Sequence, residues 1–368
     1  MLYNEGRAVL DREKAGSFMQ DARPSVSVLV PIYNVERYLR QCLDSLRAQE
    51  LDDIEFICVD DGSTDGSLAI AREYEAADAR FKVISKPNAG YGHTLNCGFD
   101  AARGAYVGVV ESDDFCASEM FSQMLEQAVR HDADIVRSSY YLYWSVPEER
   151  VEFVPCLPSD ESGIVFDPRE LPACFLFPPA LWSMLVRRSL VVDNGLRLLE
   201  TPGASYQDTA FSFKLWACAR RAFVMREGYL HYRQDNEASS INQKGKLDCV
   251  PREYEEIERF ILADEPRFGE LLPIMMKRKF SAYRWNYERM AAELHGEFAR
   301  LASREFRDAR DRGMLSQDLF SSDEWSDLAL IMRDPERFVA LQDAGDKGAL
   351  RRFHRVERVR RTLRLERG

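Results

Sequence analysis

The sequence of 368 residues lacks the long hydrophobic runs that mark membrane-spanning or exported chains. Its longest stretch without charge, Leu171–Val186, is short for a membrane span and is broken by three prolines. The N-terminal residues contain no apolar core of signal-peptide length. We therefore expect no transmembrane helix and a cytoplasmic location.

Paired cysteines and an excess of positive charge are also missing. The eight cysteines include no Cys-x-x-Cys pair, which favours reduced, mostly buried thiols. The net charge of −11 argues against a general nucleic-acid binder, so we predict no nucleic-acid partner. Residues 348–368 are an exception, because they carry eight arginines.

Apolar segments alternate with amphipathic helical segments over the first 140 residues. This alternation predicts an α/β fold with a Rossmann-like, mostly parallel sheet and helices on both faces. Beyond Trp144 the alternation weakens, and from Pro251 the apolar spacing is helical. The predicted strands are Ser25–Val30, Ile54–Val59, Phe81–Ser85, Tyr106–Val110 and a strand around Asp134–Tyr140, followed by weaker candidates at Leu181–Val186 and Ala222–Arg226.

Three regions follow from this pattern. Residues 1–23 are expected to form an extension, residues 24–245 a catalytic domain, and residues 246–368 a helical C-terminal domain with a basic tail. The tail mixes arginine with apolar residues, which suits peripheral contact with an anionic membrane surface. A basic helix packed on the acidic body is an equally good interpretation.

Three carboxylates follow the buried segment that ends at Val110, namely Glu111, Asp113 and Asp114. Open α/β sheets bind ligands outside the carboxyl ends of their strands. Adjacent carboxylates repel each other unless a cation or hydrogen-bond donors lie between them. Hard divalent cations prefer such oxygen ligands, although a solvated turn before the next helix is the simpler explanation for an isolated motif.

The order of several motifs resembles family 2 glycosyltransferases with the GT-A fold. The motifs are Val30-Pro31-Ile32-Tyr33-Asn34, Val59-Asp60-Asp61-Gly62-Ser63-Thr64-Asp65, Asn88-Ala89-Gly90, Glu111-Ser112-Asp113-Asp114, Trp182-Ser183-Met184-Leu185-Val186-Arg187-Arg188, Gln207-Asp208-Thr209-Ala210-Phe211 and His231-Tyr232-Arg233. The resemblance implies transfer of a sugar, with inversion, from a nucleotide-sugar donor, which we expect to be UDP-linked. The acceptor would be a hydroxyl of a glycan or lipid-linked molecule in cell-surface polysaccharide synthesis.

The resemblance assigns the donor nucleoside to the first two motifs. Pro31 and Tyr33 would pack against the base and ribose, and Asp61 would accept the uracil imide N–H. Without the resemblance, these segments are also typical of plain turns, with Asn34 as a helix N-cap. Gly90 would let the backbone approach the donor, and Asn96 would close the site.

A dehydrogenase is a weaker interpretation of the Gly90-Tyr91-Gly92 segment. Leu95 stands where the third glycine of a dinucleotide fingerprint is needed, and the motif follows the third strand instead of the first.

The acidic motif would hold Mn²⁺ or Mg²⁺. Asp113 is the main expected ligand, with Asp114 beside it and Glu111 as a contact to the donor sugar. Related enzymes usually begin this motif with Asp, so Glu111 is a departure. His231 is a further candidate ligand, although a lone histidine is more often structural, and Arg233 is expected to hold the diphosphate.

Inverting transfer also requires a base that takes a proton from the acceptor hydroxyl. Asp208 matches the catalytic base of the family. Related enzymes often have a glutamate directly before this base, whereas this sequence has Gln207. The alternative interpretation of Asp208 is an acidic residue that is favoured at a helix N-terminus by the helix dipole and has no catalytic role. Trp182 would stack on an acceptor sugar or pack in the core. Two other functions remain open: a nucleotidyltransferase, and a catalytically inactive sugar-nucleotide-binding protein.

Overall fold

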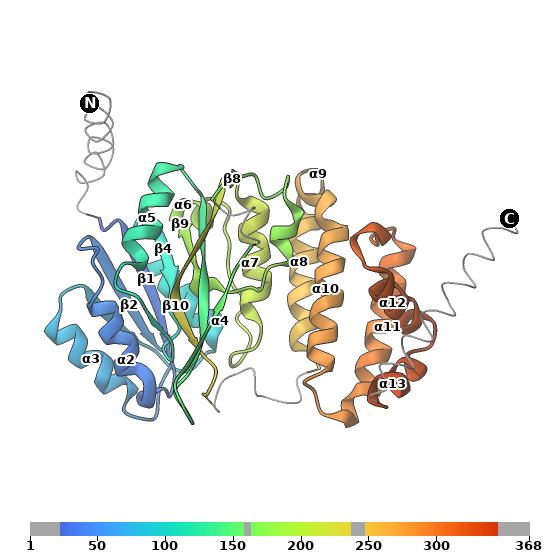
Figure 1. The fold of residues 1–368 in the computed structure, drawn as a ribbon, viewed down its shortest axis with the longest axis horizontal. Helices are drawn as coiled ribbons and strands as arrows, with labels where there is room; N and C mark the ends of the chain where they lie inside the picture. Colours follow the sequence, from blue (N-terminus) through green and yellow to red (C-terminus); the bar gives the residue numbers. More distant parts are fainter. Residues whose placement is uncertain (1–22, 158–162, 237–246, 345–368) are drawn as a thin grey trace, which may run out of the picture. The chain divides into compact units, whose positions relative to one another are not determined.

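The computed structural model describes residues 23–157, 163–236 and 247–344. The chain divides into two compact units, unit 1 (residues 1–239) and unit 2 (residues 240–368), and Figure 1 shows the elements of each. The expected domain boundary at 245 and the basic tail at 348–368 lie outside the described residues, as does the expected extension apart from residue 23.

One half of the unit 1 sheet is parallel. Its strands are rich in valine and isoleucine, and β1 and β2 are buried along their whole length. These strands lie in the order β3-β2-β1-β4, and all three pairings are parallel. The strands are β1 (Val26–Ile32), β2 (Ile54–Asp60), β3 (Phe81–Ser85) and β4 (Tyr106–Val109).

Helices cover both faces of this half, as the alternating pattern predicted. On one face, Leu39 and Phe121 join Val28 in the hydrophobic core. On the other face, Gly98 lies against Leu29, so that α4 packs closely on β1. The helices of unit 1 are α2 (Glu36–Arg47), α3 (Ser67–Ala77), α4 (Tyr91–Ala101), α5 (Met120–Arg130), α6 (Arg188–Asp193) and α7 (Gln207–Cys218), with 3-10 turns η2 (Pro172–Leu176) and η3 (Leu181–Ser183).

Antiparallel pairings enter in the second half of the sheet, which continues in the order β9-β6-β10-β5. Strand β9 runs antiparallel to both β4 and β6, and β6 runs parallel to β10. The carboxyl ends of β1, β2, β3, β4, β6 and β10 therefore meet at one edge of the sheet, which we call the carboxyl edge. The added strands are β5 (Phe115–Cys116), β6 (Ile135–Trp144), β7 (Arg150–Val154), β8 (Val165–Phe166), β9 (Met184–Arg187) and β10 (Ala222–Arg233).

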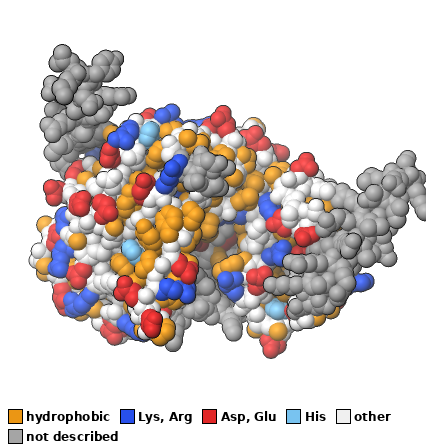
Figure 2. Space-filling view, viewed as in Figure 1, with side chains coloured by type: hydrophobic (Ala, Val, Ile, Leu, Met, Phe, Trp, Pro, Cys, Tyr) orange, Lys and Arg blue, Asp and Glu red, His pale blue; other side chains and the backbone are white. Residues whose placement is uncertain are grey.

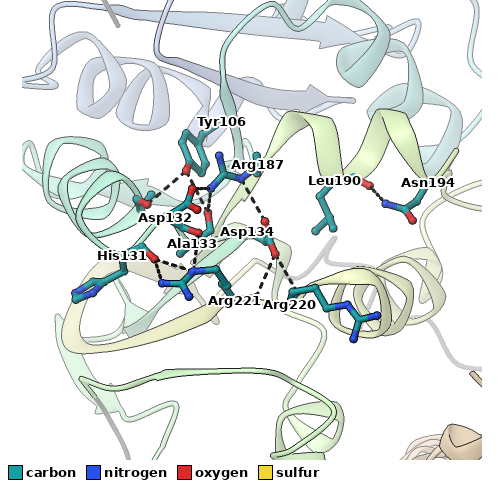
Figure 3. A network of polar contacts seen from close by, with 11 residues as sticks. Tyr106, His131, Asp132, Ala133, Asp134, Arg187, Leu190, Asn194, Arg220 and Arg221 are labelled. Carbon is teal, nitrogen blue, oxygen red and sulfur yellow. Dashed lines mark hydrogen bonds and ion pairs between the residues drawn. The ribbon is translucent and has the colours of Figure 1, made fainter. Parts of the chain in front are cut away.

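A polar network joins the strands at the opposite, amino edge (Figure 3). The Asp134 carboxylate accepts hydrogen bonds from Arg187 Nε and from the backbone N–H groups of Arg220 and Arg221. Arg187 also donates to Asp132 at 2.6 Å. Since these residues flank β6, β9 and β10, the network fixes the register where the antiparallel strand enters the sheet.

Exposed hydrophobic side chains also occur in unit 1. Figure 2 shows hydrophobic side chains gathered on the face of this unit that is turned to the viewer. Large exposed residues of unit 1 include Val146, Val151, Phe153, Ile164 and Leu176.

Unit 2 is helical in its described residues, in agreement with the apolar spacing after Pro251. Ile257, Tyr283 and Leu328 are buried as the helical stripes predicted. Ser321 and Glu324 form a capping box at the start of α12. Its helices are α8 (Cys249–Ala263), α9 (Glu265–Phe268), α10 (Leu272–Tyr287), α11 (His295–Asp311), α12 (Ser322–Arg333) and α13 (Pro335–Asp343), with 3-10 turns η5 (Gly269–Leu271), η6 (Ala292–Leu294) and η7 (Gln317–Leu319). Within the described ranges, no helix is long and apolar enough to cross a membrane.

Candidate active site

The acidic motif lies where β4 ends, at the carboxyl edge. The backbone N–H of Asp114 donates to the Glu111 carbonyl at 3.0 Å, which closes a turn around Asp113. The turn brings three carboxylates to the edge at which parallel α/β sheets bind their ligands.

Asp114 is almost completely buried, with 1% of its surface exposed. Its Oδ1 accepts a hydrogen bond from the backbone N–H of Arg233 at 2.8 Å. Its Oδ2 is buried and has no hydrogen-bond partner among the described residues. Burial, and next the Asp113 carboxylate, raise the pKa of Asp114 well above its usual value. A cation or a ligand donor would satisfy this oxygen.

Asp113 is partly exposed beside it. Its Oδ2 accepts a hydrogen bond from Asn236 Nδ2 at 2.8 Å. Across the described part of the chain, no group of three or more His, Cys, Asp or Glu side chains is placed to hold a metal ion. Asp113 and Asp114 are therefore the two carboxylates that this turn could offer to a cation, and any further ligands would have to come from elsewhere.

Glu111 forms a pair with Tyr91, the first residue of α4. The Tyr91 hydroxyl donates to Glu111 Oε1 at 2.6 Å. The pKa of Glu111 is raised to about 8. Burial is the largest cause, and the charges of Asp113 and Asp208 act in the same direction, whereas the hydrogen bond from Tyr91 lowers the pKa. Glu111 is therefore largely protonated at neutral pH, unlike an exposed glutamate.

Asp208 lies in the first turn of α7 and reaches the same group of acids. Its charge raises the pKa of Tyr91 and of Glu111. Tyr206, directly before the helix, has a left-handed backbone with φ of 65°. Such strain in a residue other than glycine persists where neighbouring contacts enforce it. Asp208 and Glu111 thus come near each other from segments almost 100 residues apart.

The loop before α7 is held in place by residues that were expected to contact the donor. The Asn96 amide bonds the backbone N–H and C=O of Leu198, each at 3.0 Å. A Cβ atom on Gly90 would come within 2.5 Å of the Thr201 carbonyl, and one on Gly92 within 1.9 Å of the Leu199 carbonyl. These contacts correct the expected roles: Asn96 and the glycines fit α4 against the loop that leads to Asp208.

Gln207 completes this support. Its Nε2 donates to Thr201 Oγ1 at 2.8 Å and to the Gly203 carbonyl at 3.1 Å, and its Oε1 accepts from the backbone N–H of Ser205. A glutamate has no N–H to donate to Thr201 and Gly203, so the glutamine matches this loop.

Asp61 follows β2 and is buried. It accepts hydrogen bonds from the backbone N–H groups of Ala89 and Gly90 at 2.8 and 2.9 Å and pairs with Lys86 Nζ. A carboxylate has about four acceptor sites, so these three donors leave one site for a ligand.

The first motif lies close to the second. Pro31 is buried within β1, whereas Tyr33 is 51% exposed and so available to stack on a ligand. The carboxamide of Asn34 accepts from the backbone N–H of Thr64 at 2.7 Å. The N-cap of α2 is Val35, so Asn34 ties the two turns together and does not cap the helix.

Arg233 does not have the role expected from its position. Its Nε donates to the Asp113 carbonyl, its Nη1 to Ser145 and Asp235, and its Nη2 to Gln41. The side chain is buried with all three guanidinium nitrogens bonded to protein groups. Arg233 therefore braces the acidic turn and is not free to hold a diphosphate.

His231 is also displaced from its expected role. Its ring is stacked between Phe115 and Tyr141, with centroid distances of 4.5 and 5.0 Å. Burial lowers its pKa, and Glu149 is the carboxylate that opposes this effect. Among the described residues, His231 does not form a metal-binding group with Asp113 and Asp114.

Two tyrosines of the site were missed from the sequence. Tyr91 stands inside the glycine segment that was examined for its backbone, and Tyr232 lies between His231 and Arg233. Asp114, Asp113, Glu111 and Asp208 all raise the pKa of Tyr232, after burial. Strand alternation gave no usable signal for Tyr232, because the register of β10 is irregular around Gly228.

Comparisons with known proteins agree with this arrangement. Residues 27–151 match the model of glycosyl transferase family 2. The chain is 35% identical over 238 residues to the uncharacterized glycosyltransferase EpsJ of Bacillus subtilis, covering 61% of this chain and 66% of EpsJ. It is 37% identical over 216 residues to the putative glycosyltransferase EpsH of the same organism, covering 57% and 61% of the two chains. The match thus spans somewhat less than two thirds of each relative.

The fold is also similar to a solved structure. S. aureus TarS 1–349, in complex with UDP, has a TM-score of 0.68 at 21% identity, covering 88% of this chain and 92% of TarS. The predicted GT-A-like α/β fold with a helical C-terminal region is confirmed by this likeness. By its motifs, its fold and its relatives, the chain contains a glycosyl transferase family 2 domain, which the family model matches over residues 27–151.

Proposed function

We propose that this chain is an inverting glycosyltransferase that moves a sugar from a UDP-linked donor to a hydroxyl of a glycan or lipid-linked acceptor. The observation that carries the proposal is the grouping of Asp208 with Glu111, Asp113 and Asp114 at the carboxyl edge. TarS has been solved with UDP-GlcNAc and with UDP, which supports a uridine donor here. We place the activity in cell-surface polysaccharide synthesis on the cytoplasmic side of a membrane.

In this proposal each acid has a separate task. The free acceptor site of Asp61 takes the imide N–H of uracil, and the exposed ring of Tyr33 packs on the base. Asp208 takes the proton of the acceptor hydroxyl on the face of the sugar opposite the leaving group. Glu111, held by Tyr91, contacts the donor sugar.

Asp113 and Asp114 would hold Mn²⁺ or Mg²⁺, which would supply positive charge beside the departing diphosphate. The buried, unpartnered Oδ2 of Asp114 supports this assignment.

Two substitutions test the separate roles. Asp208→Asn should lower the rate of transfer by roughly 10²–10⁴-fold, the usual contribution of a general base, and leave the affinity for UDP unchanged. Asp113→Asn should weaken UDP binding in the presence of Mn²⁺. Isothermal titration with UDP and an assay of sugar transfer measure the two effects, after a thermal-shift panel of nucleotide sugars has identified the donor.

The control is Asp100→Asn on α4. This change removes the carboxylate of an exposed ion pair between Asp100 and Arg197. It should change neither property. Normal transfer by both Asp113→Asn and Asp208→Asn would overturn the assignment of the site.

A further inference from the structure

Tyr232 is near the acids of the candidate site, and the proposed function gives it no role. It is the penultimate residue of β10, opposite Leu142 of β6. The next residue, Arg233, donates its backbone N–H to Asp114 Oδ1 at 2.8 Å. The Tyr232 backbone is therefore fixed directly beside the acidic turn.

The ring of Tyr232 is held by an aromatic neighbour. Its centroid lies 4.9 Å from that of Trp182, which in turn contacts Tyr140 edge-on at 4.6 Å. Tyr232 is partly buried, and its hydroxyl makes no hydrogen bond to any residue in the described parts of the chain. The ring is positioned by packing, while the polar end of the side chain has a hydrogen bond left to donate.

The surroundings of this hydroxyl are acidic. After burial, the carboxylates that raise the pKa of Tyr232 are, in decreasing order, Asp114, Asp113, Glu111 and Asp208. A tyrosine is neutral near pH 7, so the phenol is a hydrogen-bond donor.

We propose that the Tyr232 hydroxyl donates a hydrogen bond to the β-phosphate of the nucleoside diphosphate, the phosphate next to the bond that breaks. This inference rests on the proposed function. The developing negative charge of the leaving group needs donors aimed at it. Arg233, the cation expected there, is bonded throughout to protein groups. Tyr232 supplies the donor from the opposite face of the same strand.

A pair of nucleotides and a pair of variants test this contact. Tyr232→Phe keeps the ring against Trp182 and removes only the hydroxyl, so its melting temperature should match that of the native protein. Tyr140→Phe is the matched control, because Tyr140 is the second aromatic residue that contacts Trp182 and this change also removes only a hydroxyl. Isothermal titration with UDP and with UMP, each with Mn²⁺, compares ligands that differ by the β-phosphate.

Tyr232→Phe should weaken UDP binding about tenfold or more, as expected for a lost hydrogen bond to a charged group, and change UMP binding less than about twofold. Tyr140→Phe should change neither affinity. An unchanged ratio of UDP to UMP affinity in Tyr232→Phe would overturn the inference, whether both affinities fall together or both stay the same. If the native protein still transfers sugar and Asp208→Asn does not, the proposed function survives that result. A native protein that transfers no sugar from any UDP-linked donor would remove both.

Discussion

Carboxylates at the two edges of the unit 1 sheet have opposite surroundings. At the amino edge, Glu55 accepts hydrogen bonds from Ser27 and Arg103 and pairs with Lys82. Burial alone would raise the pKa of Glu55, but these partners lower it to about 2. At the carboxyl edge, burial and neighbouring acids raise the pKa of Glu111 to about 8.

The difference separates the residues that stabilise unit 1 from those that are available to a ligand. Asp134, like Glu55, is joined to several strands by donors from the chain itself (Figure 3). Asp114 keeps a buried oxygen without a partner among the described residues. Buried carboxylates without cationic partners reduce stability and are typical of functional sites. We therefore expect the carboxylates of the amino edge to stabilise unit 1 and those of the carboxyl edge to destabilise it when no ligand is bound.

Glu55→Gln provides the largest test of this comparison. Loss of the charge should lower the free energy of unfolding by about 2–3 kcal/mol at neutral pH, because Glu55 is buried and bonds two cationic side chains. Since its pKa is lowered on folding, the native advantage exists above the ordinary glutamate pKa and disappears as the pH falls toward about 2. Urea unfolding at several pH values measures the difference.

The control for this change is Glu126→Gln, which affects an exposed pair with Arg130 on α5. It should cost less than about 0.5 kcal/mol. Equal costs for the two substitutions would contradict the special role of Glu55. Sugar transfer per folded molecule should stay at the native level in both.

Asp134→Asn should have a smaller effect in the same direction. It weakens the bonds from Arg187 Nε and from the backbone N–H groups of Arg220 and Arg221. Because Asp134 is partly exposed, we expect a loss of about 1.5 kcal/mol, which corresponds to roughly 3–6 °C in melting temperature for a unit of this size. Differential scanning calorimetry would measure it, and a rise in melting temperature would contradict the comparison.

Much of the fold could be predicted from local sequence because alternating apolar strands and helices carry their own periodicity. The antiparallel direction of β9 could not, since a short apolar segment reads alike in either direction. The Arg187–Asp134 contact joins the end of β9 to the residue before β6, and such a contact between distant segments cannot be read from local sequence.

In the site, the acids could be identified from their sequence motifs. The directions in which the side chains of β10 point could not be predicted from the sequence. β10 has an irregular register around Gly228, so the alternation that begins at Ala222 does not carry over to His231 and Arg233. Arg233 was expected to hold a diphosphate from its place in the His231-Tyr232-Arg233 motif, but its guanidinium is bonded to protein groups. The packing of Gly92 on Leu199 was equally hidden, because the two residues are more than 100 positions apart.

Glu111→Gln is the smallest and most specific test, since it should reverse the sign seen at the amino edge. The raised pKa of Glu111 means that ionising it opposes folding, so the penalty is absent below the ordinary glutamate pKa and grows as the pH rises toward about 8. The neutral glutamine keeps an acceptor for Tyr91. In buffer with a chelator, the variant should be more stable than the native protein by about 1 kcal/mol near pH 8.5, since partial exposure to solvent reduces the effect, and equal to it near pH 4.5. A variant that is less stable at the higher pH would show that Glu111 is a structural acid like Glu55, and the contrast between the two edges would fail.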